Sequence, residues 1–315
     1  MNEARYRQAE ARLWTSTGMV PNEHRLRLAR TGVAVRVQEV GSGPPALFIH
    51  GVNTSGASWI RLASRLVGLR CLLLDRPGTG LSEPVVPPLT IDRLPAFAET
   101  LLVEVLDALE LPTAHLVATS FGAYFALWTA AAHPDRVDRM TLFSWSAGTP
   151  IRRLPLFMRA MGLPGIGGLA ARAPANERSI RVLFRALGHG LSLDDGRISR
   201  ADLDAYLALL RDTATRRHEL AMGRAFIHPV HGLDRMLIPD AVLGAIRAPT
   251  LLLWGEHDPF GGEDAGRRLV DRLPTAELRM LPGAGHAPWL DDLELIARET
   301  VAFLLAPSRR MASGV

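Results

Sequence analysis

The chain of 315 residues has no lysine, one cysteine and no long apolar run. All 36 basic residues are therefore arginines, which never lose their charge in proteins, and this contributes to a pI of about 10.1 at a net charge of only +4. Cys71 alone cannot form a disulfide framework, and a cysteine-based metal site is not expected. No apolar run approaches the roughly 20 residues that span a bilayer.

The N-terminal residues and the distribution of arginine exclude two further classes. The segment MNEARYRQAEARLW is charged and lacks an apolar core, so no signal peptide is predicted. No block of arginines is interleaved with aromatic residues, so nucleic-acid binding has little support. We expect a soluble cytoplasmic protein that acts on a small molecule without spanning a membrane. The sequence does not indicate its oligomeric state.

Short apolar runs alternate with helical patterns from Pro45 onward. The runs PALFIH, CLLLD, HLVAT, MTLFSW and TLLLW have the length and continuity of strands covered on both faces. Helical patterns separate them at about 57–67, 91–109 and 121–133. This alternation predicts an α/β fold, with a mostly parallel central sheet flanked by helices.

The alternation stops between residues 150 and 247 and then resumes. Within this interval SIRVLFRALG and SRADLDAYLALLRDT have helical patterns, and the second opens with a Ser-x-x-Asp cap signal. We therefore predict four parts: an N-terminal helical extension at 1–24, an α/β core at 25–149 and 248–306, an inserted helical cap at 150–247, and a flexible tail at 307–315.

Polar motifs follow the predicted strands. They are HGVN (50–53), ATSFGA (118–123), GEHDP (255–259) and GAGHAP (283–288). In parallel sheets, functional residues lie at the carboxyl ends of the strands. We therefore expect Ser120, Asp258 and His286 near one another. Their order along the chain is the one that a nucleophile-elbow hydrolase uses.

Together these motifs resemble those of the α/β-hydrolase fold superfamily, specifically its cap-bearing, esterase-like serine hydrolases. The resemblance covers about residues 25–150 and 248–306. It implies that Ser120 is the nucleophile, His286 the base and Asp258 the acid that orients the imidazole. The family usually has glycine two residues before the serine, where this chain has Ala118.

The resemblance also implies an oxyanion hole formed by the backbone amides of Val52 and Phe121. Asn53 and Trp145 are predicted to contact substrate. Asp75, in DRPGTGLS, lies on the wrong strand for the triad and is predicted to be structural. No HExxH motif indicates a metal, and no Gly-x-Gly-x-x-Gly follows a strand, so no cofactor is expected.

The predicted function is hydrolysis of an ester, or a related acyl bond, in a small to medium apolar substrate. Two alternatives use the same triad, namely hydrolysis of a carbon–carbon bond and cofactor-free perhydrolase activity. A third alternative is a non-catalytic ligand receptor, because the fold alone does not guarantee activity.

Overall fold

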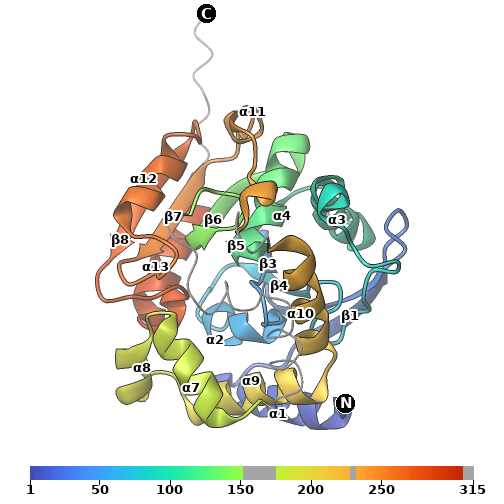
Figure 1. The fold of residues 1–315 in the computed structure, drawn as a ribbon, viewed down its shortest axis with the longest axis vertical. Coiled ribbons are helices and arrows are strands. Elements are labelled where there is room, and N and C mark those ends of the chain that lie inside the picture. The colour runs from blue at the N-terminus through green and yellow to red at the C-terminus, as the bar shows by residue number, and fades with distance from the viewer. Residues whose placement is uncertain (152–174, 228–231, 308–315) are drawn as a thin grey trace, which may run out of the picture.

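A computed structural model describes residues 1–151, 175–227 and 232–307 of the chain. Its strands form one eight-stranded sheet in the order β1-β2-β4-β3-β5-β6-β7-β8 (Figure 1). Strand β2 pairs antiparallel with β1 and β4, and the remaining pairs are parallel, as predicted. The strands are β1 (Asn22–Arg27), β2 (Ala34–Gly41), β3 (Pro45–Ile49), β4 (Arg70–Asp75), β5 (Ala114–Ser120), β6 (Val137–Ser146), β7 (Thr250–Gly255) and β8 (Ala276–Leu281).

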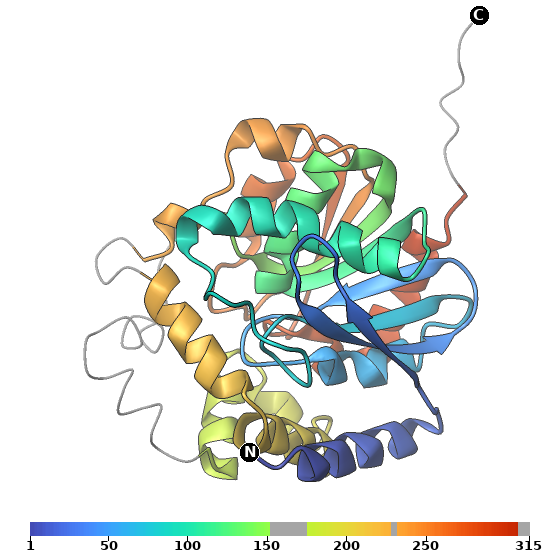
Figure 2. The same cartoon turned by 90° about the vertical axis from the view of Figure 1, so that its right-hand side faces the viewer.

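Helices cover both faces of the sheet, which explains why the central strands are continuously apolar. Alternate residues of a strand point to opposite faces, so Ala118 belongs to one apolar cluster and Val117 to the other. Figure 2 shows α3 and α4 on one side of the sheet and α1 and α2 on the other. The first face packs against α3 (Leu94–Ala108), α4 (Phe121–Ala132), α11 (Asp240–Gly244) and α12 (Glu263–Val270), and the second against α1 (Glu3–Thr17), α2 (Ile60–Ala63) and α13 (Leu293–Leu304).

Four of the helices between β6 and β7 lie toward the same end of the molecule as α1 (Figure 1), whereas α11 lies at the opposite end. They are α7 (Glu177–Ala186), α8 (Gly190–Asp194), α9 (Arg200–Asp212) and α10 (Thr215–Phe226), and we call them the inserted helices. Helix α9 begins as predicted: the Ser199 hydroxyl accepts from the N–H of Asp202, whose carboxylate accepts from the N–H of Ser199. The predicted domain boundaries stay predictions. Residues 152–174 and 228–231 of the predicted cap, and residues 308–315 of the predicted tail, lie outside the described residues.

One predicted helix is shorter than its pattern suggests. Instead of a helix over 57–67, the chain forms a 3₁₀ turn, η1 (Gly56–Trp59), followed by the single turn α2. The N–H of Gly56 donates to Oδ1 of Asp75 at 2.8 Å, which ties η1 to the end of β4. Two shorter 3₁₀ turns, η2 (Ile91–Arg93) and η3 (Pro134–Arg136), precede α3 and β6; η4 (Asp234–Met236) and η5 (Pro288–Leu290) precede α11 and α13.

None of the helices in the described part of the chain is both long enough and apolar enough to cross a membrane.

Candidate active site

Ser120 occupies a strained turn between β5 and α4. Its backbone has φ 53° and ψ −122°, a region that residues other than glycine rarely adopt. The turn is tight because α4 begins directly against β3. A Cβ placed on Gly122 would lie 2.1 Å from the carbonyl oxygen of Ile49, so only glycine fits there. Ala118 is fully buried and pairs with Ile49 and Leu142.

The HGVN loop lies directly beside Ser120. A Cβ on Gly51 would be 3.1 Å from the Cβ and 3.6 Å from the Oγ of Ser120. Val52 and Asn53 follow in the loop and line the same cavity as Ser120, and Asn53 has φ 58°. Phe121 lies at the other side of the turn, in the first turn of α4. The N–H groups of a first helical turn have no acceptor within the helix, so the N–H of Phe121 has none there.

His50 supports this loop as a neutral imidazole. Its Nε2 accepts a hydrogen bond from the N–H of Arg76 at 3.0 Å, so the ring proton lies on Nδ1, 2.8 Å from the carbonyl oxygen of Gly51. Burial, and then the nearby charge of Arg76, lower the pKa of His50 well below its usual value. His50 is therefore a structural group of the loop rather than a second base.

Asp258 and His286 are brought together from two different loops. Nδ1 of His286 lies 3.1 Å from Oδ1 of Asp258. The carboxylate also accepts from two backbone amides, Trp145 N–H on Oδ2 at 2.8 Å and Phe260 N–H on Oδ1 at 3.0 Å. Asp258 is buried, whereas Glu256 is exposed and accepts from the N–H of Gly283.

The side chain of Trp145 lies in the core and is not among the cavity-lining residues. It stacks on Phe260 with ring centroids 5.0 Å apart, and Phe260 in turn packs against His286 at 4.6 Å. Its contribution to the site is the backbone N–H that holds Asp258. The prediction that Trp145 contacts substrate thus finds no support in its placement.

A second histidine and aspartate, which the sequence patterns did not single out, hold the His286 loop. His189 Nδ1 lies 2.9 Å from Asp291 Oδ2, and its Nε2 accepts from the N–H of Ala287 at 3.2 Å. Asp291 also accepts from the N–H of Gly285 at 2.8 Å. The N–H of His286 itself donates to the carbonyl oxygen of Leu187 at 2.9 Å. Backbone amides at 285, 286 and 287 are therefore all fixed, and two of the three acceptors lie between α7 and α8.

A buried ion pair ties the inserted helices to the HGVN loop. Nη2 of Arg76 donates to Oε1 of Glu219, on α10, at 2.7 Å. The same guanidinium donates to the carbonyl oxygens of His50 and Gly51, each at 2.9 Å. Burial raises the pKa of Glu219, and the charge of Arg76 opposes that shift. Arg76 follows β4 in DRPGTGLS, but its partner is 143 residues away, so no local pattern could reveal the pair.

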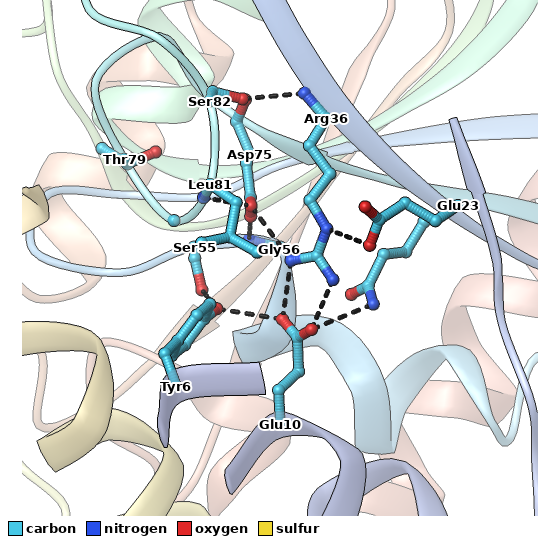
Figure 3. A network of polar contacts seen from close by, with 12 residues as sticks. Tyr6, Glu10, Glu23, Arg36, Ser55, Gly56, Asp75, Thr79, Leu81 and Ser82 are labelled. Atoms are coloured by element: carbon cyan, nitrogen blue, oxygen red, sulfur yellow. Dashed lines mark hydrogen bonds and ion pairs between the residues drawn. The ribbon is translucent and has the colours of Figure 1, made fainter. Parts of the chain in front are cut away.

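Asp75 lies in a different polar network, as predicted for a structural residue. Its Oδ2 accepts from the N–H of Leu81 at 2.9 Å and lies 3.3 Å from Nη1 of Arg36, while Oδ1 accepts from Gly56 (Figure 3). These contacts join β2, β4, η1 and the loop that follows β4. None of them involves Ser120 or His286.

Ser120 and His286 open into one cavity of about 200 Å³. Its walls are mostly apolar and come from the sheet end, the inserted helices and α1. The single arginine among the described lining residues is Arg61, which is bound to Asp202 at 3.0 Å. Within residues 1–151, 175–227 and 232–307, no group of three or more His, Cys, Asp or Glu side chains is placed to hold a metal ion.

Comparisons with known proteins agree with this architecture. Residues 46–299 match the model of the alpha/beta hydrolase family. A 2-hydroxy-6-oxononadienedioate/2-hydroxy-6-oxononatrienedioate hydrolase of Cupriavidus pinatubonensis is 31% identical over 281 residues, which are 87% of this chain and 91% of that protein. A pimeloyl-[acyl-carrier protein] methyl ester esterase of Chromobacterium violaceum is 31% identical over 265 residues, 81% of this chain and 91% of the other.

Among solved structures, the naproxen esterase (carboxylesterase NP) of Bacillus subtilis superposes with a TM-score of 0.71 at 17% identity, covering 95% of this chain and 97% of that one. At this identity the similarity establishes the fold alone.

Proposed function

The chain belongs to the alpha/beta hydrolase family, and on that premise we propose that this hydrolase cleaves an ester of a small to medium apolar substrate through Ser120, His286 and Asp258. The observation that carries the proposal is the placement of Ser120 in a strained turn at the same cavity as His286, whose Nδ1 is held by Asp258. The inserted helices α7–α10 are, on this proposal, the cap that closes the cavity.

Each of the three side chains has a definite task in such a reaction. With its proton on Nδ1 directed at Asp258, His286 keeps Nε2 free to take the proton of the Ser120 hydroxyl. The oxygen of Ser120 then attacks the ester carbonyl, and His286 returns the proton to the departing alcohol. Water, activated by the same imidazole, releases the acid and regenerates Ser120.

The negative charge that develops on the carbonyl oxygen needs donors already in position. We assign this role to the backbone N–H groups of Phe121, at the start of α4, and of Val52, in the loop against Ser120. Arg76 fixes the carbonyl oxygens of His50 and Gly51, and thereby the peptide that carries the N–H of Val52. Removing one such donor typically costs on the order of 10²–10³ in kcat.

The polarity of the cavity favours a neutral substrate. The lining residues in the described part of the chain are mainly apolar, and the charge of Arg61 is already balanced by Asp202. Glu219 also lines the cavity, and its carboxylate is paired with Arg76. Among the described lining residues a dicarboxylate would meet little unpaired positive charge, and its desolvation would be unfavourable. An uncharged ester suits these walls better.

Covalent labelling tests the proposal. A fluorophosphonate should modify Ser120, as located by peptide mass mapping, and Ser120→Ala should abolish both the adduct and the turnover of p-nitrophenyl esters. Ser146→Ala is a matched control, because Ser146 is the neighbour of Ser120 on β6 and its buried hydroxyl has no hydrogen-bond partner among the described residues. An adduct on another serine would contradict the assignment of the nucleophile.

Carbon–carbon bond hydrolysis is the second candidate, because the relative from Cupriavidus pinatubonensis carries the name of an enzyme that acts on a 2-hydroxy-6-oxo dienedioate. The two functions are distinguished by comparing kcat/KM for p-nitrophenyl esters with kcat/KM for 2-hydroxy-6-oxo-dienoates, one series with a second carboxylate and one with a neutral group in its place. Preference for any of these dienoates over every ester would replace our proposal by the second candidate.

A further inference from the structure

We infer that the N-terminal helix α1 is a wall of the substrate cavity, and that its Leu13 sets how large an apolar portion of the ester the cavity accepts. This inference rests on the proposed function and names a residue that determines its specificity. The family model matches residues 46–299, so α1 lies outside the part of the chain that the family describes.

Leu13 lines the same cavity as Ser120 and His286. Ala57 of η1 and Ala205 of α9 belong to the same apolar cluster as Leu13, and both line the cavity, as does Leu209 of α9. Figure 1 and Figure 2 both show α1 running beside the inserted helices at this end of the molecule. The wall therefore combines three segments that are far apart in the sequence, and α1 contributes the side chain of Leu13 to it.

The burial pattern of α1 explains why Leu13 points inward. Tyr6, Ala9, Glu10, Leu13 and Trp14 are buried, and their spacing of three and four residues places them on one face of the helix. Four of these residues are apolar or aromatic, while the fifth is a carboxylate. A charged residue on the buried face of a helix requires a partner, because an unpaired buried charge is strongly unfavourable.

Arg36 of β2 is that partner. Its Nη1 donates to Oε1 of Glu10 at 2.9 Å, and its Nη2 donates to Oε2 of the same carboxylate (Figure 3). Nε of Arg36 donates to Glu23 at 2.7 Å, and Nη1 also lies 3.3 Å from Oδ2 of Asp75. A bidentate arginine–carboxylate pair permits one geometry, so it fixes how far α1 is advanced along its axis and how it is rotated.

Two further contacts hold α1 on either side of the wall. The hydroxyl of Tyr6 donates to Oε1 of Glu10 and lies 2.9 Å from Oγ of Ser55, a cavity-lining residue just before η1 (Figure 3). At the start of the helix, the N–H of Asn2 donates to the carbonyl oxygen of Asp212, at the end of α9. Helix α1 is thus fixed both to the core and to the inserted helices, and Leu13 has a defined position in the cavity.

The test compares ester size preference in Leu13→Ala and Leu13→Phe. Two ester series are used. One consists of p-nitrophenyl esters of increasing acyl length, and the other of acetates of increasing alcohol length, whose hydrolysis is monitored by the release of protons. Leu13→Ala should raise the ratio of kcat/KM for long over short esters in at least one series, and Leu13→Phe should lower it. We expect the ratio to change about tenfold, because adding or removing the space for a methylene group in an apolar pocket changes substrate discrimination by at least this order.

Leu66→Ala is the matched control. Leu66 belongs to the same apolar cluster as Leu13 and is equally buried, but it does not line the cavity, so its substitution should leave the ratio unchanged. Because the ratio compares two substrates on one preparation, it does not depend on how much of a destabilised variant is folded.

The outcomes separate the two proposals. If the wild-type protein turns over esters in a Ser120-dependent way but neither Leu13 variant alters the ratio in either series, the inference about α1 is wrong and the proposed function stands. The inference about α1 is equally wrong if Leu66→Ala shifts the ratio as much as Leu13→Ala. If the wild-type protein hydrolyses no ester in either series, the proposed function fails, and this inference fails with it.

Discussion

Asp258 and Asp75 are both buried carboxylates at or just beyond the ends of sheet strands, but their partners give them different tasks. The carboxylate of Asp258 accepts hydrogen bonds from the N–H groups of Trp145 and Phe260, and its Oδ1 also faces Nδ1 of His286. Asp75 joins structural segments through Gly56, Leu81 and Arg36. The identity of the acid is therefore decided by what surrounds the carboxylate.

Asp258→Asn should leave a folded protein whose kcat for esters is about 10⁴ lower, because the amide cannot hold the imidazole in the required tautomer. Asp75→Asn should instead lower the melting temperature while changing kcat much less, since it weakens contacts that fix the fold. Both quantities are measured on both variants. A well-folded but inactive Asp75→Asn protein would mean that the acid has been assigned to the wrong strand.

At the scale of elements, the turn between β5 and α4 depends on how closely α4 approaches β3. The sequence motif predicted the turn and its serine, because Ala118 to Gly122 are local in sequence and the strain is local as well. It also directed attention to Ala118 as the residue that the family replaces by glycine. The structure shows that Gly122 also requires a small residue, because a Cβ there would meet the carbonyl oxygens of Ile49 and His50.

Gly122→Ala should lower both the melting temperature and kcat/KM. Alanine favours a helix over glycine by about 1 kcal/mol, but a Cβ at 2.1 Å from a backbone oxygen forces α4 away from β3, and overpacking of this kind typically costs about 1–3 kcal/mol or more. Ala118→Gly is the matched control and should cost only about 0.5–1 kcal/mol with most activity kept. A stable, fully active Gly122→Ala protein would show that the turn can relax.

Contacts between distant segments were beyond the reach of the sequence patterns. Strand and helix periodicity predicted the sheet and the motifs at its edge, because each depends on neighbours along the chain. The pairs Arg76–Glu219 and His189–Asp291 join residues 143 and 102 positions apart, and nothing in their local sequence indicates the partner. One signal was available: Glu10 interrupts the apolar face of α1, which indicates a buried partner for its charge.

At the scale of the whole molecule, the inserted helices are attached to both halves of the candidate site. Helix α10 reaches the HGVN loop through Glu219, and the segment between α7 and α8 holds the His286 loop. His218, which precedes Glu219 on α10, packs against the loop that follows β4. A Cβ placed on Gly78 of that loop would lie 2.5 Å from the His218 ring. Charging this imidazole would therefore disturb the attachment of α10.

Burial, with a smaller contribution from the charge of Arg76, lowers the pKa of His218 to about 4, against about 6.5 in an unfolded chain. Between these values the unfolded state binds more protons, so the free energy of unfolding falls as the pH falls, by up to about 1.4 kcal/mol per pH unit for this group. Urea unfolding at pH values between about 7 and 5 should show a steeper loss in the wild type than in His218→Gln. Parallel curves would contradict the assignment.

The pairing of α1 with α9 has a consequence for the order in which the chain is made. Helix α1 leaves the ribosome before α9, because Asp212, which accepts the hydrogen bond from Asn2, follows 210 residues later. At typical rates of about 5–20 residues per second this is a wait of about 10–40 seconds. During that time the face bearing Leu13 and Trp14 has no α9 to cover it. The partners of α1 in the core, Arg36 and Ser55, are made early, but the side of α1 that packs on α9 stays uncovered in the nascent chain until α9 has been made.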